Sequence, residues 1–308
     1  MAVAKTLTTL GRSIWRIGVG RPRVVVMGGV HGNERTGVEV VNLLVRKLLS
    51  ETIQKGELTL VIGNPEAVDK NTRFLEDDLN RCFGLPFEAT SLEHRRAKEL
   101  EPYLTNIDIL IDLHATNKPS HPFVRLPGPL SHGLFRNCQK HFLDALPPSC
   151  NTVLWDPDYL IGRGHMSDEF TWRHAATPEE GSFICYEAGL ASDTSAVPST
   201  EHAVNHLLSH VGMMSGPCTA LDKGRLWQHV SIVKTVTLDE RGFEWMNGFG
   251  SENFQNVPAG MVFGRRPGDG TTLSFPRESC IVFPKIEALW GIGKPLGWLA
   301  TPVLEFPS

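Results

Sequence analysis

The fold class can be inferred from the stretch Arg23-Val24-Val25-Val26-Met27-Gly28-Gly29-Val30-His31-Gly32-Asn33-Glu34. Its β-branched run, Val24 to Val26, ends at two glycines and is typical of a buried strand. The following segment, Thr36 to Ser50, carries apolar residues at helical spacing and predicts a helix with one apolar face. A strand, a glycine turn and a helix in this order are typical of an α/β unit.

The same alternation continues over the first two thirds of the chain. Three further apolar runs predict strands and two amphipathic patterns predict helices: strands at 58–62, 107–113 and 182–186, and helices at 90–104 and 199–213. Thr90 and Glu93 match a capping box at the start of the first of these helices. We therefore expect an α/β fold, a mostly parallel or mixed sheet with helices on both faces.

The sequence changes in character near residue 216. From there on it is rich in glycine, proline and short β-type runs, such as 231–238 and 280–283, and no long helix is predicted. We expect two domains: residues 1–215 form the larger α/β domain, and residues 216–308 form a smaller, β-rich C-terminal domain.

Composition excludes several classes of partner. Among 308 residues the net charge is −4, and no polybasic run suggests binding to nucleic acid or to an anionic membrane. No segment approaches the roughly 20 apolar residues of a membrane-spanning helix. Six cysteines without paired spacing are typical of reduced thiols, so we expect a cytoplasmic protein.

Polar residues follow three of the predicted strands. His31 and Glu34 are three residues apart after the first strand, His114 follows the run 107–113, and Glu187 follows the run 182–186. In parallel sheets ligands bind beyond the carboxyl ends of the strands, so these residues are expected at one site. Two histidines and one glutamate form a known catalytic zinc set that leaves a position open for water. We predict one Zn²⁺ per chain on His31, Glu34 and His114, with Glu187 as general base.

Two motifs together resemble the aspartoacylase and succinylglutamate desuccinylase family, relatives of the zinc carboxypeptidases. They are Gly28 to Glu34 and Asp77-Asp78-Leu79-Asn80-Arg81, and the resemblance extends over essentially the whole chain. It implies a carboxypeptidase-like catalytic domain, followed by a β-domain that covers the active-site cleft. The implied activity is hydrolysis of a small N-acyl amino acid to a carboxylate and a free amino acid.

The resemblance also implies roles for further residues. Arg73 matches the family's oxyanion-stabilising arginine, and Asn80 and Arg81 match its substrate-carboxylate pair. Asp112 is placed to orient a ligand histidine. No nucleic-acid or membrane partner is expected, and family precedent favours a dimer or larger homo-oligomer.

Three positions depart from the aspartoacylase pattern. Ala115 follows His114 where the family has asparagine, and Thr177 stands where it has the arginine for the acyl-side carboxylate, although Arg173 is nearby in sequence. The family's C-terminal tyrosine is replaced around Leu289-Trp290. The catalytic residues are thus retained while the substrate-reading residues differ, and the acyl group stays open among succinyl, acetyl and less polar groups.

Two alternatives stay open from the sequence. The chain could be a zinc carboxypeptidase acting on short peptides, or a catalytically silent zinc-containing binding protein. A separate row of histidines, His202, His206 and His210, recurs every four residues on a predicted helix. Because this helix lacks the glutamate of a His-Glu-x-x-His motif, we expect solvated or half-buried histidines there rather than a metal site.

Overall fold

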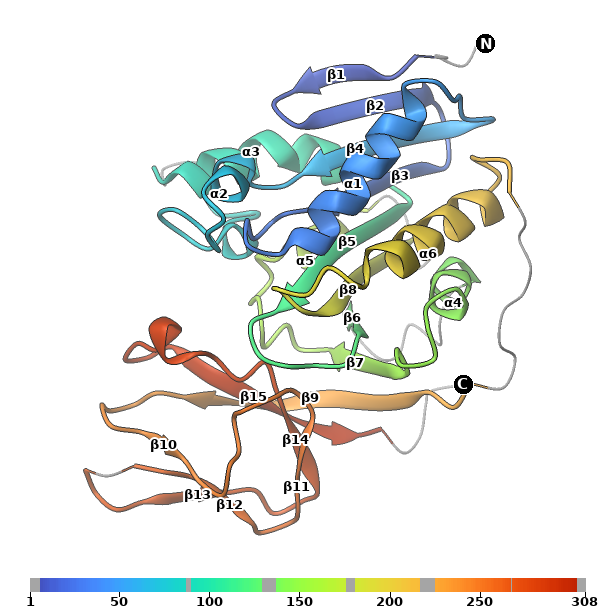
Figure 1. The fold of residues 1–308 in the computed structure, drawn as a ribbon. Coiled ribbons are helices and arrows are strands. Elements are labelled where there is room, and N and C mark those ends of the chain that lie inside the picture. The colour runs from blue at the N-terminus through green and yellow to red at the C-terminus, as the bar shows by residue number, and fades with distance from the viewer. Residues whose placement is uncertain are drawn as a thin grey trace.

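A sheet of twelve strands runs through the whole molecule, with helices on both faces of its N-terminal part (Figure 1). The computed structural model describes residues 6–86, 90–128, 137–175, 181–216, 225–266 and 268–303. A second, three-stranded sheet lies at the C-terminal end. The predicted α/β class with a mixed sheet, helices on both faces and a β-rich C-terminal part is confirmed.

The elements follow the predicted alternation. In spatial order the strands of the large sheet are β1 (Thr8–Gly11), β2 (Ile14–Val19), β4 (Gly56–Ile62), β3 (Arg23–Gly28), β5 (Ile109–Thr116), β8 (Ser182–Leu190), β6 (Phe123–Pro127), β7 (Thr152–Asp156), β9 (Gln228–Thr237), β15 (Pro295–Pro302), β14 (Ser279–Val282) and β11 (Gln255–Val257). The small sheet contains β10 (Glu244–Trp245), β12 (Val262–Arg265) and β13 (Thr272–Ser274). The helices are α1 (Arg35–Leu48), α2 (Pro65–Asp69), α3 (Leu92–Leu104), α4 (Asn137–Asp144), α5 (Ser167–Arg173) and α6 (Val197–His210), with 3₁₀ turns η1 (Leu79–Arg81) and η3 (Glu287–Leu289).

The centre of the large sheet is parallel. β4, β3, β5 and β8 run side by side in one direction, and β6 is antiparallel to β8. Residues of β3 alternate between the two faces, as strand geometry requires. Val24 and Val26 pack in the same core as α1 and α6, whereas Val25 and Met27 pack in the core that includes α3 and α5. Both faces of the central strands are therefore buried, which explains why their sequences are continuously apolar.

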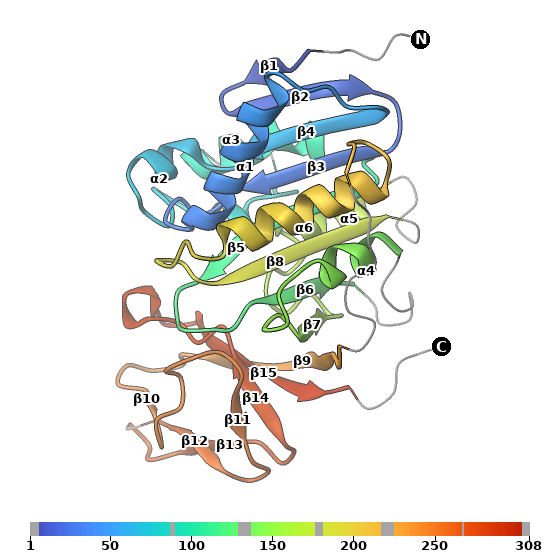
Figure 2. The same cartoon turned by 45° about the vertical axis from the view of Figure 1, so that its right-hand side comes forward.

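The C-terminal strands continue the sheet rather than standing apart from it. β9 pairs in parallel with β7, with Thr152 opposite Gln228 and Trp155 opposite Ser231, and β15, β14 and β11 follow (Figure 2). The division between residues 215 and 216 stays a prediction, since hydrogen bonding crosses from one part to the other. No helix in the described ranges is long and apolar enough to cross a membrane.

Two details of the predicted elements were wrong. The predicted strands ended at 113 and 186, but β5 extends to Thr116 and β8 to Leu190, so His114 and Glu187 lie within strands. The predicted capping box was also wrong. Ser91 caps α3 by accepting a hydrogen bond from the His94 N–H, and Glu93 instead reaches a distant loop.

Candidate active site

His31, Glu34 and His114 form a compact, buried cluster. One ligand atom from each residue lies within 4.8 Å of the others. The Nδ1 atom of His31 is 2.7 Å from Glu34 Oε1, and the Nδ1 atom of His114 is 3.0 Å from Glu34 Oε2. The two imidazole rings thus point the same nitrogen at one carboxylate, and the structure brings the three predicted ligands together.

Gly29 and Gly32 allow the backbone path that positions the side chains of His31 and Glu34. Gly29 has a φ of +68°, a left-handed conformation that turns the chain sharply after β3. Gly32 lies so close to α2 that an added Cβ would be 2.0 Å from the Ala67 carbonyl carbon. The chain then enters α1 directly after Glu34, so both side chains face the end of the sheet where His114 lies on β5.

A carboxylate holds the outer nitrogen of each ring. His31 Nε2 lies 3.0 Å from Asp78 Oδ1, and His114 Nε2 lies 3.0 Å from Asp112 Oδ2. Asp112 is fully buried and also accepts a hydrogen bond from the Ser167 hydroxyl at the start of α5. Histidines that bind metals commonly have such partners, which fix the ring orientation and the tautomer.

The charges of the cluster favour an ionised glutamate. Burial alone would raise the pKa of Glu34, but His31 and His114 lower it well below its usual range. Burial would likewise lower the pKa of His114, yet Asp112 and Glu34 raise it well above its usual range. Arg73 and the backbone N–H of Ala115 also donate to Glu34. The Glu34 carboxylate is therefore held as an anion by His31, His114, Arg73 and a backbone N–H.

This donor set fits zinc. Two imidazole nitrogens and one carboxylate oxygen are ligands that zinc accepts, and catalytic zinc sites use three protein ligands with one open position. Within the described residues, the only group of this kind is His31, Glu34 and His114. The small pocket beside them is lined by polar residues such as Asn80, Asn117 and Glu187 and by apolar residues such as Ile161 and Phe283.

Glu187 lies beside the cluster on the neighbouring strand. It pairs with His114 across β5 and β8, and the residue is only 7% exposed. Its Oε2 atom is buried and has no hydrogen-bond partner among the described residues. Burial raises the pKa of Glu187 to about 7, partly offset by His114. A carboxylate with this pKa accepts and returns protons efficiently near neutral pH.

The remaining predicted residues also reach this end of the sheet. Arg73 donates to Glu34 Oε1 at 3.2 Å and to Asp78 Oδ2 at 3.3 Å. Asn80 is buried, accepts a hydrogen bond from the Ser167 N–H, and places its Nδ2 atom 3.5 Å from His114 Nε2. Arg81 lines the pocket and donates to the Asn80 carbonyl at 2.5 Å.

Several pocket residues were not identified from the sequence. Phe283 and Lys285 come from the C-terminal part, and Asn117, Ile161 and Met166 come from loops of the larger part. None belongs to a recognisable motif, because each reaches the site only through the packing of distant segments. For Lys285, the available signal was a lone lysine that follows the apolar run 280–283 after Pro284.

Other residues named from the sequence lie elsewhere. Arg173 donates to the Gly164 carbonyl in a separate surface pocket, and Thr177 lies outside the described residues. His206 is buried and His210 half-buried, both close to His141, while His202 is exposed. These histidines do not form a metal-ligand group among the described residues.

Comparison with known proteins gives the family. The model of the succinylglutamate desuccinylase/aspartoacylase catalytic domain matches residues 20–182. The chain belongs to this family. Both sequence motifs that carried the resemblance, including His31, Glu34 and the Asp77 to Arg81 segment, fall within the matched region.

Individual members of the family resemble the chain over most of its length. Succinylglutamate desuccinylase from Shewanella denitrificans is 28% identical over 280 residues, which is 86% of this chain and 78% of that protein. The structure of succinylglutamate desuccinylase from Vibrio cholerae has a TM-score of 0.79 at 19% identity and covers 98% of this chain and 90% of that one. Murine aminoacylase 3 has a TM-score of 0.63 at 17% identity, covering 91% and 95%.

Proposed function

We propose that the protein is a zinc-dependent deacylase. It hydrolyses the amide bond of a small N-acyl amino acid and releases a carboxylate and a free amino acid. The observation that carries this proposal is the buried, unpartnered Oε2 of Glu187 beside the cluster of His31, Glu34 and His114. An unsatisfied buried acceptor is costly, and a role in accepting a proton from water accounts for it.

The proposed roles follow from the positions of the side chains. Zinc held by His31, Glu34 and His114 would acidify a bound water and polarise the scissile carbonyl. Glu187 takes the proton of the attacking water and returns it to the leaving amine. Arg73, at the edge of the cluster, donates to the oxygen on which negative charge develops.

The substrate's α-carboxylate is assigned to the Asn80–Arg81 pair. Arg81 presents a guanidinium that forms no ion pair within the described part of the chain, and an arginine fork matches a carboxylate in two parallel hydrogen bonds. Asn80 accepts a hydrogen bond from the Ser167 N–H and lies 3.5 Å from His114 Nε2, which holds it beside Arg81 in the pocket wall. The relatives' names, succinylglutamate desuccinylase and aminoacylase 3, support an N-acyl amino acid as substrate.

A substrate panel tests the proposal. Zinc-loaded protein is incubated with N-acetyl, N-succinyl and N-formyl amino acids and with unblocked dipeptides, and released amine is measured. We expect release from one acyl class, lost when a chelator removes the metal. Cleavage of the dipeptides alone would instead identify a carboxypeptidase. Silence across the panel with zinc bound would favour a binding protein.

Replacing Glu187 separates catalysis from metal binding. Glu187→Gln preserves the shape of the side chain but cannot accept the proton, so kcat should fall on the order of 10²–10⁴-fold. The zinc content, measured by atomic absorption, should stay at one per chain because Glu187 is not a ligand in this assignment. Retained activity would exclude Glu187 as the base.

We propose a cytoplasmic location, which rests on the scattered, unpaired spacing of the cysteines in the sequence.

A further inference from the structure

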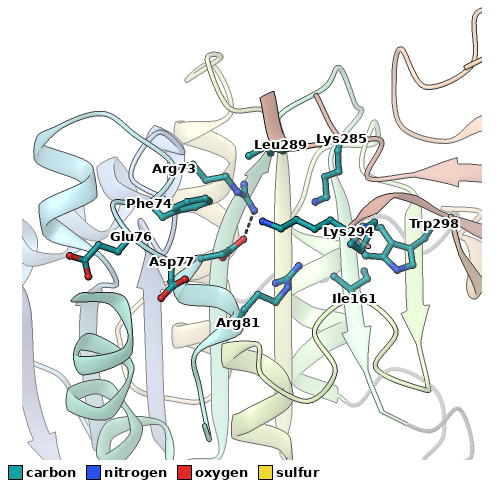
Figure 3. Close-up of a pocket in the computed structure, with 12 residues that line it drawn as sticks. Arg73, Phe74, Glu76, Asp77, Arg81, Ile161, Lys285, Leu289, Lys294 and Trp298 are labelled. Atoms are coloured by element: carbon teal, nitrogen blue, oxygen red, sulfur yellow. Dashed lines mark hydrogen bonds and ion pairs between the residues drawn. The ribbon is translucent and has the colours of Figure 1, made fainter. Parts of the chain in front are cut away.

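The first turn of α5 lies beside the metal pocket. The loop from β7 to α5 reaches the mouth of that pocket. Ile161 of this loop lines both the metal pocket and an adjoining cavity of about 360 Å³, where Figure 3 shows it across the cavity from Arg73. Met166, at the end of the loop, also lines the metal pocket. Ser167 follows as the first residue of α5, but it is fully buried and lines neither cavity. Its side chain therefore lies behind the residues that a substrate would touch.

The Ser167 hydroxyl contacts the carboxylate that holds His114. It donates to Asp112 Oδ2, the oxygen that lies 3.0 Å from His114 Nε2. The other oxygen of this carboxylate, Oδ1, is buried and has no hydrogen-bond partner among the described residues. Because Asp112 is fully buried, loss of a partner would leave its carboxylate poorly satisfied. The orientation of the carboxylate thus depends on the His114 ring and on the Ser167 hydroxyl.

Ser167 also contacts a second neighbour of the same ring. Its backbone N–H donates to Asn80 Oδ1 at 2.9 Å, and Asn80 Nδ2 lies 3.5 Å from His114 Nε2. This N–H belongs to the backbone, so replacing the side chain leaves the contact with Asn80 in place. Ser167→Ala therefore removes the hydrogen bond to Asp112 alone.

A buried charge cluster fixes the position of Ser167. The next two residues, Asp168 and Glu169, pair with Arg125 of β6, and all three side chains are fully buried. An ion pair buried this deeply is costly to break. The Ser167 carbonyl also accepts a hydrogen bond from the Thr171 hydroxyl at 2.7 Å. The first turn of α5 therefore gives the Ser167 hydroxyl a fixed position.

The register of β5 presents Asp112 to that hydroxyl. Alternate residues of a strand share a face, so Leu110, Asp112 and His114 lie on one face of β5. Leu110 packs in the same core as Phe170 of α5. The face of β5 that carries the histidine of the cluster is therefore the face that α5 covers.

We propose that Ser167 is a positioning residue for the metal site. Its hydroxyl orients the Asp112 carboxylate, and this carboxylate in turn holds the His114 ring at Nε2, so that Nδ1 faces Glu34 in the cluster. Ser167 itself touches neither the metal nor the substrate in this assignment. The inference rests on the metal site of the proposed function, and it can be tested by metal binding without turnover.

Zinc affinity, measured by competition with a chromogenic chelator, tests the role of the hydroxyl. Ser167→Ala should weaken zinc binding on the order of 5- to 10-fold, because it acts one step further from the metal than a carboxylate whose loss typically costs about 10- to 100-fold. Thr171→Val is the matched control. It removes an equally buried hydroxyl of α5 that donates to a backbone carbonyl, and it should leave the affinity unchanged. Denaturant unfolding of both variants separates a general loss of stability, which both share, from the loss of affinity.

A double-mutant cycle tests the route through Asp112. In the Asp112→Ala protein the hydroxyl has lost its acceptor, so adding Ser167→Ala should change the zinc affinity less than about twofold. The full loss in that background would show that Ser167 acts by another route, and it would overturn the inference. Wild-type affinity in the folded Ser167→Ala protein, or an equal loss in Thr171→Val, would also overturn it.

These outcomes are separate from the deacylase activity. Zinc binding with the expected effects of the variants, but no hydrolysis of any member of the substrate panel, would overturn the proposed function and leave the inference standing. Hydrolysis of the panel together with wild-type zinc affinity in Ser167→Ala would do the reverse. Absence of zinc binding by the wild-type protein would overturn both.

Discussion

Asp78 and Asp112 each hold the outer nitrogen of one cluster histidine at 3.0 Å. Without them either ring could rotate or adopt the other tautomer, and the inner nitrogens would no longer converge on Glu34. The two carboxylates reach the rings from different directions: Asp78 precedes η1, whereas Asp112 lies two residues before His114 on the same face of β5. Metal affinity at this site is therefore expected to depend on groups that do not touch the metal.

We expect Asp112→Asn and Asp78→Asn each to weaken zinc affinity by about 10- to 100-fold, because each removes the carboxylate that orients a ligand ring. Competition with a chromogenic chelator measures the affinity. Asp69→Asn, at an exposed position on α2, is the matched control and should leave it unchanged. Unchanged affinity in both folded variants would show that the rings are held by other contacts.

At the scale of single elements, helix α3 organises the loop that carries Arg73 and Asp78. Glu93 is buried in the first turn of α3 and accepts hydrogen bonds from the backbone N–H groups of Leu75, Glu76 and Asp77 at 2.7–3.2 Å. Asn64 adds a fourth donor at 3.1 Å. Burial would raise the pKa of Glu93, but these donors lower it. The Glu93 carboxylate thus holds the backbone of residues 75–77, and with it the loop that carries Arg73 and Asp78, against helix α3.

Glu93→Gln should lower the free energy of unfolding by about 2–3 kcal/mol, since an amide NH₂ would face two backbone N–H donors. It should also reduce kcat/KM, because Arg73 lies on the loosened loop. Denaturant unfolding and steady-state kinetics measure the two effects. The control is Glu99→Gln on α3, where Glu99 is exposed and the buried Arg96 keeps its hydrogen bonds to the Gly63, Ile62 and Arg12 carbonyls, so the loss of this ion pair should cost less than about 1 kcal/mol. Equal effects of the two substitutions would contradict this role of Glu93.

At the scale of the whole molecule, a buried charge cluster joins the second half of the sheet to α5. Arg125 on β6 pairs with Asp156 on β7 and with Asp168 and Glu169 on α5, and all four side chains are fully buried. One cation therefore faces three carboxylates. Burial raises the pKa of Asp168 to about 6; Arg125 opposes this shift and Glu169 adds to it.

This pKa makes stability depend on pH in a defined direction. Below about pH 4 the Asp168 carboxyl is protonated in both the folded and the unfolded chain. Between about pH 4 and pH 6 the unfolded chain has lost this proton and the folded chain retains it, so the stability that Asp168 contributes is lost as pH rises. Asparagine cannot ionise, and the Asp168→Asn protein should lack this component.

We expect the stability of wild type relative to Asp168→Asn to fall by on the order of 2 kcal/mol from pH 4 to pH 7. Denaturant unfolding at intervals of one pH unit measures this difference. Asp158→Asn, at an exposed position on the loop after β7, is the control, and its free energy of unfolding should change with pH as that of wild type does. Parallel curves for Asp168→Asn as well would show that Asp168 is ionised in the fold across this range.

Local elements and the close spacing of His31 and Glu34 could be predicted from the order of residues alone. The run from Val24 to Val26 predicted β3, and the apolar spacing after Thr36 predicted α1. Both predictions succeed because the spacing of apolar residues along the sequence reflects the periodicity of the strand or helix. His31 and Glu34 belong to one turn, so three residues of spacing were enough to pair them. The motif at Asp77 to Arg81 carried part of the family resemblance and lies within the region that the family model matches, while the substrate role of Asn80 and Arg81 stays a prediction.

The contacts that distant segments make at this site depend on packing and could not be predicted from the sequence. The strand ends at His114 and Glu187 were wrong because neighbouring strands extend the ladder beyond the apolar runs. Glu93 matched a capping box in sequence, yet its carboxylate binds a loop more than fifteen residues away. There it accepts hydrogen bonds from three backbone N–H groups, whereas a capping box would offer it one. Lys285, which follows β14, lines the pocket of the cluster because β9, β15 and β14 continue the sheet past β7. Such contacts depend on how the elements pack together, which no local pattern of residues records.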